Sequence, residues 1–449
     1  MLHKENFNNM NDSVKQFLKR IEDNSCVIGI IGLGYVGLPL AVSFAKKSIK
    51  VIGFEKSIVK VSKVNEAKNY IADVQDDDLV TVVSEKRLFA TSDFKLIKEC
   101  DAIIICVPTP LDRFKKPDMS FIESACVEIG QNMKAGTFIS LESTTYPTTT
   151  EEFMKPIIER ESGLKEGSDF WLCFSPERVD PGNKTYRTEN TPKVVGGLGE
   201  EAQTIAMVLY GKAIQNLYPV SSPRVAEMVK ILENTYRLVN ISLINELALL
   251  AGKMDINIWE VIDAAKSKPY GFQAFYPGPG IGGHCIPLDP FYLEYIAKGY
   301  NFDLTMIDAA GRINTLMPYR MMNKISYALN RQGKPMNDST ILFLGVAYKA
   351  DIDDARESPA LLVMEECAKK RANVLYYDPY IPEVVDEHGK KWTATALTDE
   401  LLESADCVVF TTAHSCFDVE HIVEKAKLVV DTRNAVRSIQ IENEKVFKL

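Results

Sequence analysis

The sequence lacks the features that would place a protein in a membrane, outside the cell or on nucleic acid. No apolar run among its 449 residues is long enough to cross a bilayer, and no basic and then apolar leader follows Met1. The formal net charge is -9, and no run concentrates Lys and Arg as a phosphate-tracking surface would. We therefore expect a cytoplasmic protein with no membrane and no nucleic-acid partner.

Cysteine pairs at metal-ligand spacing are also absent. The nine cysteines are scattered singly, and Cys100, Cys106, Cys173 and Cys407 lie in or beside apolar runs that look like strands. Small buried thiols in a reducing cytosol are the expectation for these four. No metal site is predicted.

The pattern along the chain predicts several domains. From Ser25 the apolar runs CVIGII, KVIGF, DAIIICV and TFISL alternate with helical stretches, which is typical of a parallel sheet. The C-terminal third repeats this plan in STILFL, ANVLYY, DCVVF and KLVVD, so a second, degenerate dinucleotide-type domain is expected. Residues 1–24 are polar and weakly amphipathic, and we expect a short helix or arm there with no assignable role.

A long helix should join the two sheets. Between Ser221 and Gly252 the apolar residues recur at three and four, and from Val225 no Pro or Gly interrupts the pattern before Gly252. The fold class is therefore α/β, with two Rossmann-like doubly wound parallel-sheet domains joined by a central helical region. We place these parts at residues 25–215, 216–329 and 330–449.

The first strand leads into a dinucleotide-binding pattern. Gly32, Gly34 and Gly37 form G-x-G-x-x-G between a strand and a helix, where glycines permit a tight turn, a close approach of backbone to pyrophosphate and helix packing. Glu55 ends the second strand, where an acid can accept hydrogen bonds from ribose hydroxyls, which favours NAD over NADP. Lys56 beside it weakens that preference, and the alternative is a glycine-rich turn without a ligand.

Two further strand ends fall at the same carboxyl edge. Pro108 and Thr109 close DAIIICVPTP, and Ser143 to Pro147 close TFISLESTTYP. Ligands bind at this edge in open parallel sheets, so these hydroxyls are expected to touch cofactor or substrate. Polar caps that merely terminate strands are the alternative.

The segment PGPGIGGHCIPLDPFYL sets Cys285 apart from the other cysteines. So many Gly and Pro residues demand a particular loop conformation. Pro287 suits the first turn of a helix through Leu293, whose N-terminus would lower the pKa of the Cys285 thiol, with Asp289 one turn further on. We expect His284 to shape the loop; a Cys–His dyad is the alternative.

Lys230 and Asn234 are four residues apart on the expected long helix and share a face. An ammonium and an amide there could stabilise an oxyanion. Taken alone, Lys230 is better explained as a solvated surface lysine.

The motifs GLGYVG, CVPTP, ESTTYP, FSPERVDPGN, KILEN, GPGIGGHCIPLDP and AYKADIDDARESP, in this order, resemble the UDP-glucose/GDP-mannose dehydrogenase family over nearly the whole chain. SPERVDPGN and GGHCIPLDPFYL look like the branch that acts on UDP-N-acetylhexosamines. The chain is most similar to UDP-N-acetylglucosamine 6-dehydrogenases of bacterial surface-polysaccharide pathways.

This resemblance implies a role for each matching residue. Cys285 would be the nucleophile, Lys230 and Asn234 would steady the oxyanion, and Asp289 with Thr145 would serve a water and proton relay. Glu177 would be a further catalytic residue, facing both substrate and cofactor. The resemblance assigns the remaining ligand contacts as follows: Glu177, Arg178, Lys230, Asn234, Tyr276, Gly282 and Arg433 to the substrate, and the Tyr35–Val36 loop, Pro108, Thr109, Thr145, Lys349 and Arg356 to NAD. Glucose-specific members have a second glutamate four residues after the position of Glu177, where this chain has Pro181, so the general acid/base stays open.

The implied reaction removes four electrons from a primary alcohol, so two NAD are used in succession. Cys285 would trap the aldehyde as a thiohemiacetal and pass through a thioester that water cleaves. The UDP moiety would lie against the second α/β domain. The long helix resembles the element through which family members dimerise, so a homodimer or higher homo-oligomer is expected. An apolar face that packs wholly within one chain is the alternative.

Other functions remain open at this point. UDP-N-acetylmannosamine, UDP-N-acetylgalactosamine and UDP-glucose are alternative substrates, because sequence spacing does not reveal how C2 and C4 are read. A two-electron β-hydroxyacid or glycerol-phosphate type dehydrogenase would have no use for Cys285. A catalytically silent NAD-binding sensor or scaffold would tolerate its loss.

Overall fold

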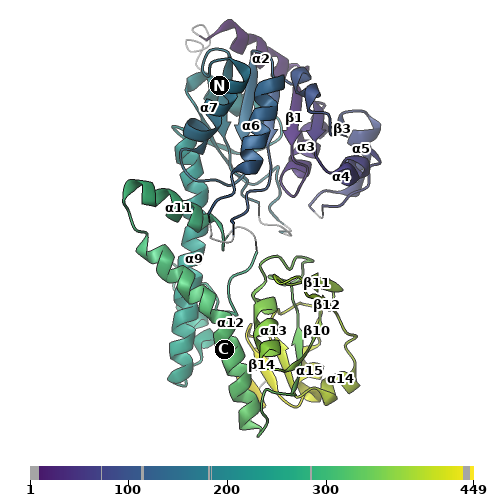
Figure 1. Cartoon of the computed structure of the whole chain (residues 1–449), viewed down its shortest axis with the longest axis vertical. Helices are drawn as coiled ribbons and strands as arrows, with labels where there is room; N and C mark the ends of the chain where they lie inside the picture. Colours follow the sequence, from purple (N-terminus) through teal and green to yellow (C-terminus); the bar gives the residue numbers. More distant parts are fainter. Residues whose placement is uncertain are drawn as a thin grey trace. The chain divides into compact units, whose positions relative to one another are not determined.

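The structure is a computed structural model, and it describes residues 10–71, 73–112, 116–179, 183, 185–283, 286–437 and 445–449. Two compact units divide the chain (Figure 1). The first consists of Met1–Glu233 with Tyr295–Tyr300, and the second of Asn234–Glu294 with Asn301–Leu449. Within the described ranges, no helix combines the length and the apolar character that a membrane crossing requires.

An eight-stranded sheet forms the centre of the first unit. The strand order is β3-β2-β1-β4-β5-β6-β7-β8, and all pairs are parallel except β6 with β7. The strands are β1 Val27–Ile31, β2 Lys50–Phe54, β3 Leu88–Thr91, β4 Ala102–Ile105, β5 Thr137–Leu141, β6 Phe170–Phe174, β7 Lys193–Gly197 and β8 Leu217–Pro219. Because β1, β4, β5 and β6 are almost wholly buried, their apolar runs are continuous rather than alternating.

Helices cover both faces of this sheet, as a doubly wound fold requires (Figure 1). On one face lie α2 Asp12–Glu22, α3 Gly37–Lys46, α4 Ile58–Asn65, α5 Asp76–Ser84 and α8 Glu200–Tyr210. On the other lie η1 Phe94–Glu99, α6 Ser120–Asn132, the π-helix η2 Thr149–Met154 and α7 Lys155–Ser162. Each face has its own cluster of buried apolar side chains.

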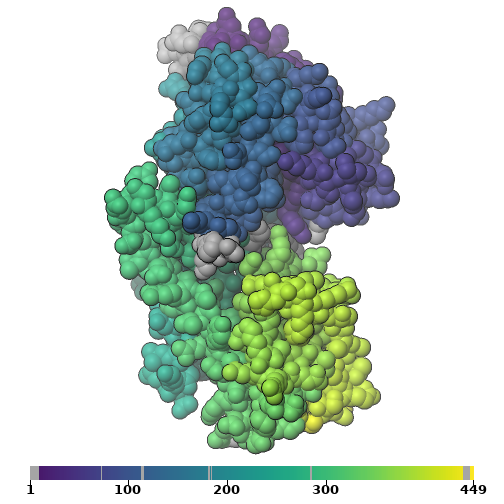
Figure 2. Space-filling view, in the orientation of Figure 1, coloured from purple at the N-terminus to yellow at the C-terminus, as the bar shows by residue number. Residues whose placement is uncertain are grey.

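The N-terminal helix α2 is part of the packed domain. Val14, Phe17, Leu18 and Ile21 form one buried stripe that joins the core cluster of α3 and α8. Its polar face stays on the surface, visible in purple at the top of Figure 2. The sequence indicated a helix or arm here, and the structure adds a role for it, because α2 shields one face of the sheet from water.

The central region is helical. It contains α9 Pro223–Lys253, α10 Ile258–Lys266, α11 Asp289–Ala297, the short 3-10 helix η3 Lys298–Tyr300 and α12 Thr305–Arg331. The predicted long helix is α9. The helix after the cysteine loop begins two residues later than predicted, because residues 286–288 form a turn and Asp289 is the first helical residue, so Pro287 precedes α11.

A second parallel sheet, of order β10-β9-β13-β14-β15, completes the chain. Its strands are β9 Thr340–Leu344, β10 Asn373–Tyr377, β13 Cys407–Phe410, β14 Val429–Asp431 and β15 Val446–Lys448. Its helices are α13 Pro359–Lys369, α14 Asp399–Ser404 and α15 Val419–Lys425, and a hairpin joins β11 Glu383–Val385 to β12 Lys391–Thr393. The predicted fold class, two Rossmann-like domains with a central helical region, is confirmed.

The two domains share the same turn after their first strand. Gly32 follows β1 with φ 93°, and Gly345 follows β9 with φ 83°. In each turn the next backbone N–H donates to an acid at the end of the neighbouring strand: Leu33 N to Glu55 Oε2 at 3.2 Å, and Val346 N to Asp378 Oδ2 at 2.7 Å. The second domain is therefore a structural repeat of the first.

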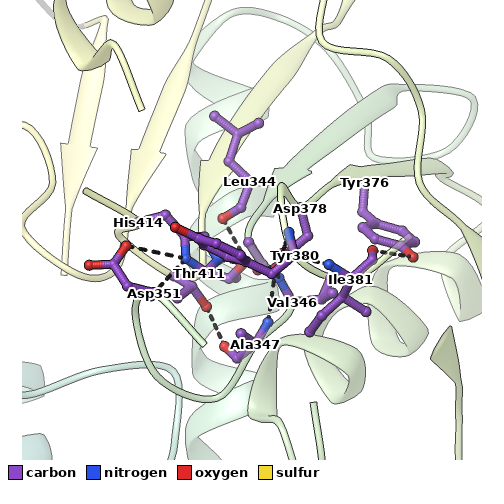
Figure 3. A network of polar contacts seen from close by, with 12 residues as sticks. Leu344, Val346, Ala347, Asp351, Tyr376, Asp378, Tyr380, Ile381, Thr411 and His414 are labelled. Atoms are coloured by element: carbon purple, nitrogen blue, oxygen red, sulfur yellow. Dashed lines mark hydrogen bonds and ion pairs between the residues drawn. The ribbon is translucent and has the colours of Figure 1, made fainter. Parts of the chain in front are cut away.

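In the second domain, Asp378 is the centre of a buried polar network (Figure 3). Its Oδ2 accepts from the backbone N–H groups of Val346 and Ala347 and contacts His414 Nε2 at 3.1 Å, while Oδ1 accepts from Tyr380 and Ile381. Asp351 N donates to His414 Nδ1, so that nitrogen has no proton and Nε2 is the donor to Asp378. Burial alone would raise the pKa of Asp378, but the hydrogen bonds from His414 and the backbone outweigh it and lower that pKa.

We predict that Asp378→Asn destabilises the protein by about 2 kcal/mol, because several buried donors lose their acceptor. The native pKa of Asp378 is lowered, so the stabilisation is present above the ordinary aspartate pKa and is lost only as the pH falls through the native value. Denaturant unfolding should therefore show that Asp378→Asn lowers the free energy of unfolding by the same amount at pH 5 and at pH 8.

Asp399→Asn is the matched control, since Asp399 also contacts a histidine, His421, but both side chains are more than two-fifths exposed. Its effect should stay below about 1 kcal/mol. Equal losses in the two variants would contradict the role given to burial.

Candidate functional site

The glycine loop after β1 has the geometry that a dinucleotide needs. A Cβ at Gly32 would meet Cys106 O at 2.5 Å, and one at Gly37 would meet Gly32 O at 1.9 Å, so both positions require glycine for packing. Gly34 faces open space, with nothing within 4 Å of its Cβ position. The loop thus leaves its backbone accessible at the one glycine where a pyrophosphate approaches in this motif. The Tyr35–Val36 pair connects this position to α3.

Glu55 lies beside this loop at the end of β2. Its Oε2 accepts from Leu33 N at 3.2 Å and its Oε1 from Ser57 N at 3.0 Å. Lys56 does not neutralise this carboxylate, since its Nζ donates to Ser124 Oγ at 2.9 Å. A carboxylate therefore stands where an adenosine ribose would be recognised, and the residues present fit NAD.

The ends of β4 and β5 are neighbours at the same edge, because these strands pair in parallel. Pro108 is exposed and Thr109 is buried in the loop after β4. Thr145 follows β5 and is buried, with its Oγ1 2.6 Å from Thr149 Oγ1. The structure thus places these predicted residues together at the carboxyl edge.

Glu177 is held by backbone and by a buried lysine. Its Oε1 accepts from the N–H groups of Arg178 and Val179, both at 2.8 Å, and its Oε2 lies 3.9 Å from Lys193 Nζ. Lys230 of α9 donates to the backbone oxygen of Glu177 at 2.6 Å. Lys230 is therefore half-buried at the site and is not the solvated surface lysine that its sequence context alone suggested.

Sequence reasoning missed a buried charge network behind Glu177. Lys193 Nζ donates to Glu142 Oε2 at 2.5 Å, and Tyr210 Oη donates to Glu142 Oε1 at 2.6 Å. Burial raises the pKa of Glu142 to about 7, against the opposing effect of Lys193. The available signal was a lysine opening the otherwise apolar run KVVGG, since a fully buried strand tolerates a lysine only when a partner neutralises it.

Arg178 makes its side-chain contacts with residues of the first unit. Its guanidinium contacts Glu233 at 2.5 Å and donates to Pro192 O at 2.7 Å. Pro181, which stands where glucose-specific members have a glutamate, lies outside the described residues together with its neighbours 180 and 182.

In the second unit, Asn234 and Asp289 form a pair that the sequence placed in one site. Asn234 Nδ2 donates to Asp289 Oδ2 at 2.5 Å, and both side chains are at most 3% exposed. Cys285 and His284 lie outside the described residues. The segment that holds them is bounded by Gly283 and by Ile286, three residues before Asp289.

Hydrogen bonds and close packing hold the loop before Cys285 against other residues of the second unit. Ile281 N donates to Asn314 Oδ1 at 2.6 Å, and Gly283 N donates to Arg356 O at 3.2 Å. A Cβ at Gly282 would meet Tyr348 Cβ at 2.7 Å, and one at Gly283 the Tyr348 ring at 2.8 Å. These glycines are required because the loop lies directly against the turn after β9.

Arg433 lies at the start of the same loop. Its guanidinium occupies the space that a Cβ at Gly278 would need, and its Nε donates to Thr411 O at 3.2 Å. Burial lowers the pKa of Arg433 to about 10. This half-buried guanidinium is a ready partner for an anion.

The remaining predicted residues of the second unit are less closely gathered. Arg356 makes a two-pronged contact with Asp354, and Lys349 is half-buried in the turn after β9. Tyr276 stacks on Trp259, with ring centroids 6.0 Å apart. Within the described part of the chain, no three His, Cys, Asp or Glu side chains gather as a metal site. Cys100, Cys106, Cys173 and Cys407 are buried free thiols, as predicted.

Comparison with known proteins covers both units. Three models of the UDP-glucose/GDP-mannose dehydrogenase family match in order: the NAD binding domain over residues 26–214, the central domain over 224–316 and the UDP binding domain over 342–438. The UDP-N-acetyl-D-mannosamine dehydrogenase of Pyrococcus horikoshii is 35% identical over 416 residues, which is 91% of this chain and 96% of that protein.

Two further relatives agree with this match. The UDP-N-acetyl-D-glucosamine 6-dehydrogenase of Salmonella typhi is 35% identical over 395 residues, covering 87% of this chain and 90% of that protein. The solved structure of the UDP-D-ManNAc dehydrogenase from Pyrococcus horikoshii superposes with a TM-score of 0.86 at 33% identity, covering 94% of this chain and 98% of that one. The chain therefore belongs to the UDP-glucose/GDP-mannose dehydrogenase family and is an NAD-dependent oxidoreductase that acts on UDP-sugars.

Proposed function

We propose that the chain oxidises the C6 hydroxymethyl of a UDP-N-acetylhexosamine, most directly UDP-N-acetylglucosamine, to the carboxylate through a thioester on Cys285. The observation behind this proposal is the buried Asn234–Asp289 pair beside the clamped glycine loop. The pair supplies a carboxylate, on Asp289, four residues after the cysteine in the chain, and an amide, on Asn234, that is hydrogen-bonded to it. A two-electron alcohol dehydrogenase needs neither the thiol nor this pair.

The electron balance explains why a thiol is needed. The alcohol loses two electrons to become an aldehyde, and the Cys285 thiol adds to its carbonyl carbon to give a thiohemiacetal. Loss of two more electrons gives the thioester, and water then cleaves the C–S bond to release the acid and the thiol. NAD, when bound, accepts one hydride in each oxidation. The glycine loop after β1, from Gly32 to Gly37, and Glu55 are the residues that would hold NAD.

The protein groups around the reacting carbon would stabilise charge. Lys230 gives one hydrogen bond to Glu177 O and retains two ammonium protons for an oxyanion, and Asn234 offers an amide. A good donor of this kind contributes about 3 kcal/mol in comparable sites. Asp289 and Thr145 would accept hydrogen bonds from the hydrolytic water. Arg433 would offer positive charge to the diphosphate of UDP, whereas the resemblance assigns Lys349 and Arg356 to NAD.

UDP-N-acetylmannosamine is the second candidate substrate. Relatives of equal identity are named for the mannosamine and the glucosamine sugars. The glucosamine assignment is supported by the motifs SPERVDPGN and GGHCIPLDPFYL. The reaction would supply an acidic sugar precursor for a surface polysaccharide, and its reduced thiol fits a cytoplasmic enzyme.

We predict two NADH per sugar consumed, with one clearly preferred substrate among UDP-N-acetylglucosamine, UDP-N-acetylmannosamine, UDP-N-acetylgalactosamine and UDP-glucose. NADH absorbance and chromatography of the acid product measure both quantities. One NADH per sugar would indicate a simple alcohol dehydrogenase. None with any sugar, despite NAD binding, would indicate a silent sensor.

Cys285→Ser should stall after the first oxidation and lower acid formation by about 10³-fold or more, because serine is not the thiol that the thioester requires. Cys416→Ser is the matched control, since Cys416 is an exposed cysteine outside the site, and it should retain full activity. Acid formation at the normal rate by Cys285→Ser would exclude the thioester route.

Glu55→Ala should weaken NAD binding by about tenfold, because a charged acceptor for the ribose hydroxyls is lost. Binding is measured by titration with NAD, and thermal unfolding without NAD reports any effect on the Leu33 turn. Glu66→Ala, in the same domain and paired with nearby Lys68, is the control. Unchanged NAD affinity in Glu55→Ala would remove the ribose role.

We further propose that α9 mediates a homodimer. In the second unit, its apolar residues Tyr236, Leu243, Leu247 and Leu250 recur at helical spacing and are all more than two-fifths exposed, as is Met254 directly after the helix. A stripe of this kind is costly to leave in water, and a second copy of the same helix could cover it.

Leu247→Glu should convert this dimer to a monomer, because it places a charge in the middle of the stripe. Sedimentation velocity measures the mass. Val80→Glu, which adds the same charge at a comparably exposed position of α5, should leave the mass unchanged. A wild-type monomer, or a Leu247→Glu dimer, would contradict the assignment.

A further inference from the structure

A strained turn follows Thr145 directly. Thr148 has φ 85°, a left-handed conformation that is rare for a β-branched residue, and the chain then enters the π-helix η2 at Thr149. π-helical turns and strained residues concentrate at functional sites and persist only where their surroundings hold them. Thr148 lies only three residues after Thr145, which has a proposed role in the reaction, so the purpose of this turn needs an explanation.

Glu227 of α9 holds the turn. Its Oε2 accepts from Thr148 N at 2.7 Å, and its Oε1 accepts from Thr150 N at 2.9 Å and from Thr150 Oγ1 at 2.7 Å. These are N–H groups at a helix start, which have no partner within the helix. Glu227 is fully buried, and burial raises its pKa to about 7 in spite of these three hydrogen bonds.

The turn places two hydroxyl groups in contact. Thr149 Oγ1 donates to Tyr146 O at 2.7 Å, because a carbonyl oxygen can only accept. A hydroxyl has one proton, so Thr149 cannot also donate to Thr145. In the 2.6 Å contact between Thr145 Oγ1 and Thr149 Oγ1, Thr145 is therefore the donor. Its own proton is committed inside the protein, and only its lone pairs remain for a ligand.

We propose that Thr149 is a positioning residue that makes Thr145 an acceptor-only hydroxyl toward the reacting groups, and that Glu227 maintains this arrangement. The inference rests on the proposed function, in which Thr145 serves the water and proton relay. An acceptor at this position draws the O–H of a water or of the sugar toward itself. A freely rotating hydroxyl would as often donate, and would then compete for the oxygen lone pair that must react.

The decisive comparison is between Thr149→Val and Thr149→Ser. Valine keeps the branched shape but removes the acceptor for Thr145, so kcat should fall about tenfold while KM for sugar and for NAD stays within about twofold. Serine keeps the hydroxyl and should restore kcat. Equal loss in both variants would show that shape matters rather than hydrogen bonding, and unchanged kcat in Thr149→Val would overturn the proposal.

Thr137→Val is the matched control in the same domain. Thr137 is equally buried, and its Oγ1 likewise donates to the carbonyl three residues earlier, Lys134 O at 2.8 Å, but at the opposite end of β5. This variant should have normal kcat at a temperature below all unfolding midpoints. A comparable loss of kcat in Thr137→Val would make the effect of Thr149→Val a general consequence of losing a buried hydroxyl, and would overturn the proposal.

Thr145→Val separates this inference from the function on which it rests. If Thr145→Val is fully active, the relay role of Thr145 fails. If Thr145→Val is impaired and Thr149→Val is not, only the positioning role fails. Because Thr149 acts through Thr145, the double variant should be no slower than Thr145→Val alone, and an additive loss would overturn the proposal.

Discussion

Carboxylates that accept from backbone N–H groups, and that are buried or partly buried, fix the loops at the carboxyl edges of both sheets. Glu55 accepts from the turn after β1, Asp378 from the turn after β9, and Glu227 from the strained turn after β5. Glu177 accepts from the two amides that follow it. In a parallel sheet these loops all start at the same edge, and their buried backbone N–H groups still need hydrogen-bond acceptors where water cannot reach. An acid supplies two acceptor atoms in a small volume, and it can bridge loops that are distant in sequence.

Burial and hydrogen bonding have opposite effects on these acids, and the balance differs between sites. Asp378 receives donors on both oxygens, including His414, and its pKa is lowered. For Glu227 and Glu142, burial raises the pKa by more than the hydrogen-bond donors lower it. The pKa of each therefore rises to about 7. Acids with raised pKa values lie on either side of Thr145 in the first unit: Glu142 three residues before it, and Glu227 across the turn after it. Strongly perturbed groups of this kind are characteristic of functional sites.

The sequence was sufficient for features that depend on local spacing. It predicted both sheets, the long helix, and the glycine loop with Glu55. It could not predict the partners of Lys193 and Glu227, because their acids and amides lie 51 and 77 residues away in the chain and meet only when the sheet forms. The π-helix also has no periodic signature, since its extra residue breaks the 3.6-residue pattern. The start of α11 was placed two residues early because a proline in a first turn is permitted but not required.

The repeat of the first domain in the second shows how one turn can take two functions. Gly34 leaves open space where a pyrophosphate can approach, whereas its counterpart Ala347 donates its N–H to Asp378. In the first domain α3 begins at Gly37, but in the second α13 begins only at Pro359. The N–H groups of Val346 and Ala347 in the second turn are thus satisfied internally by Asp378, which also contacts His414. That edge also carries the Arg433 guanidinium, which in the proposed function would meet the diphosphate of the UDP-sugar.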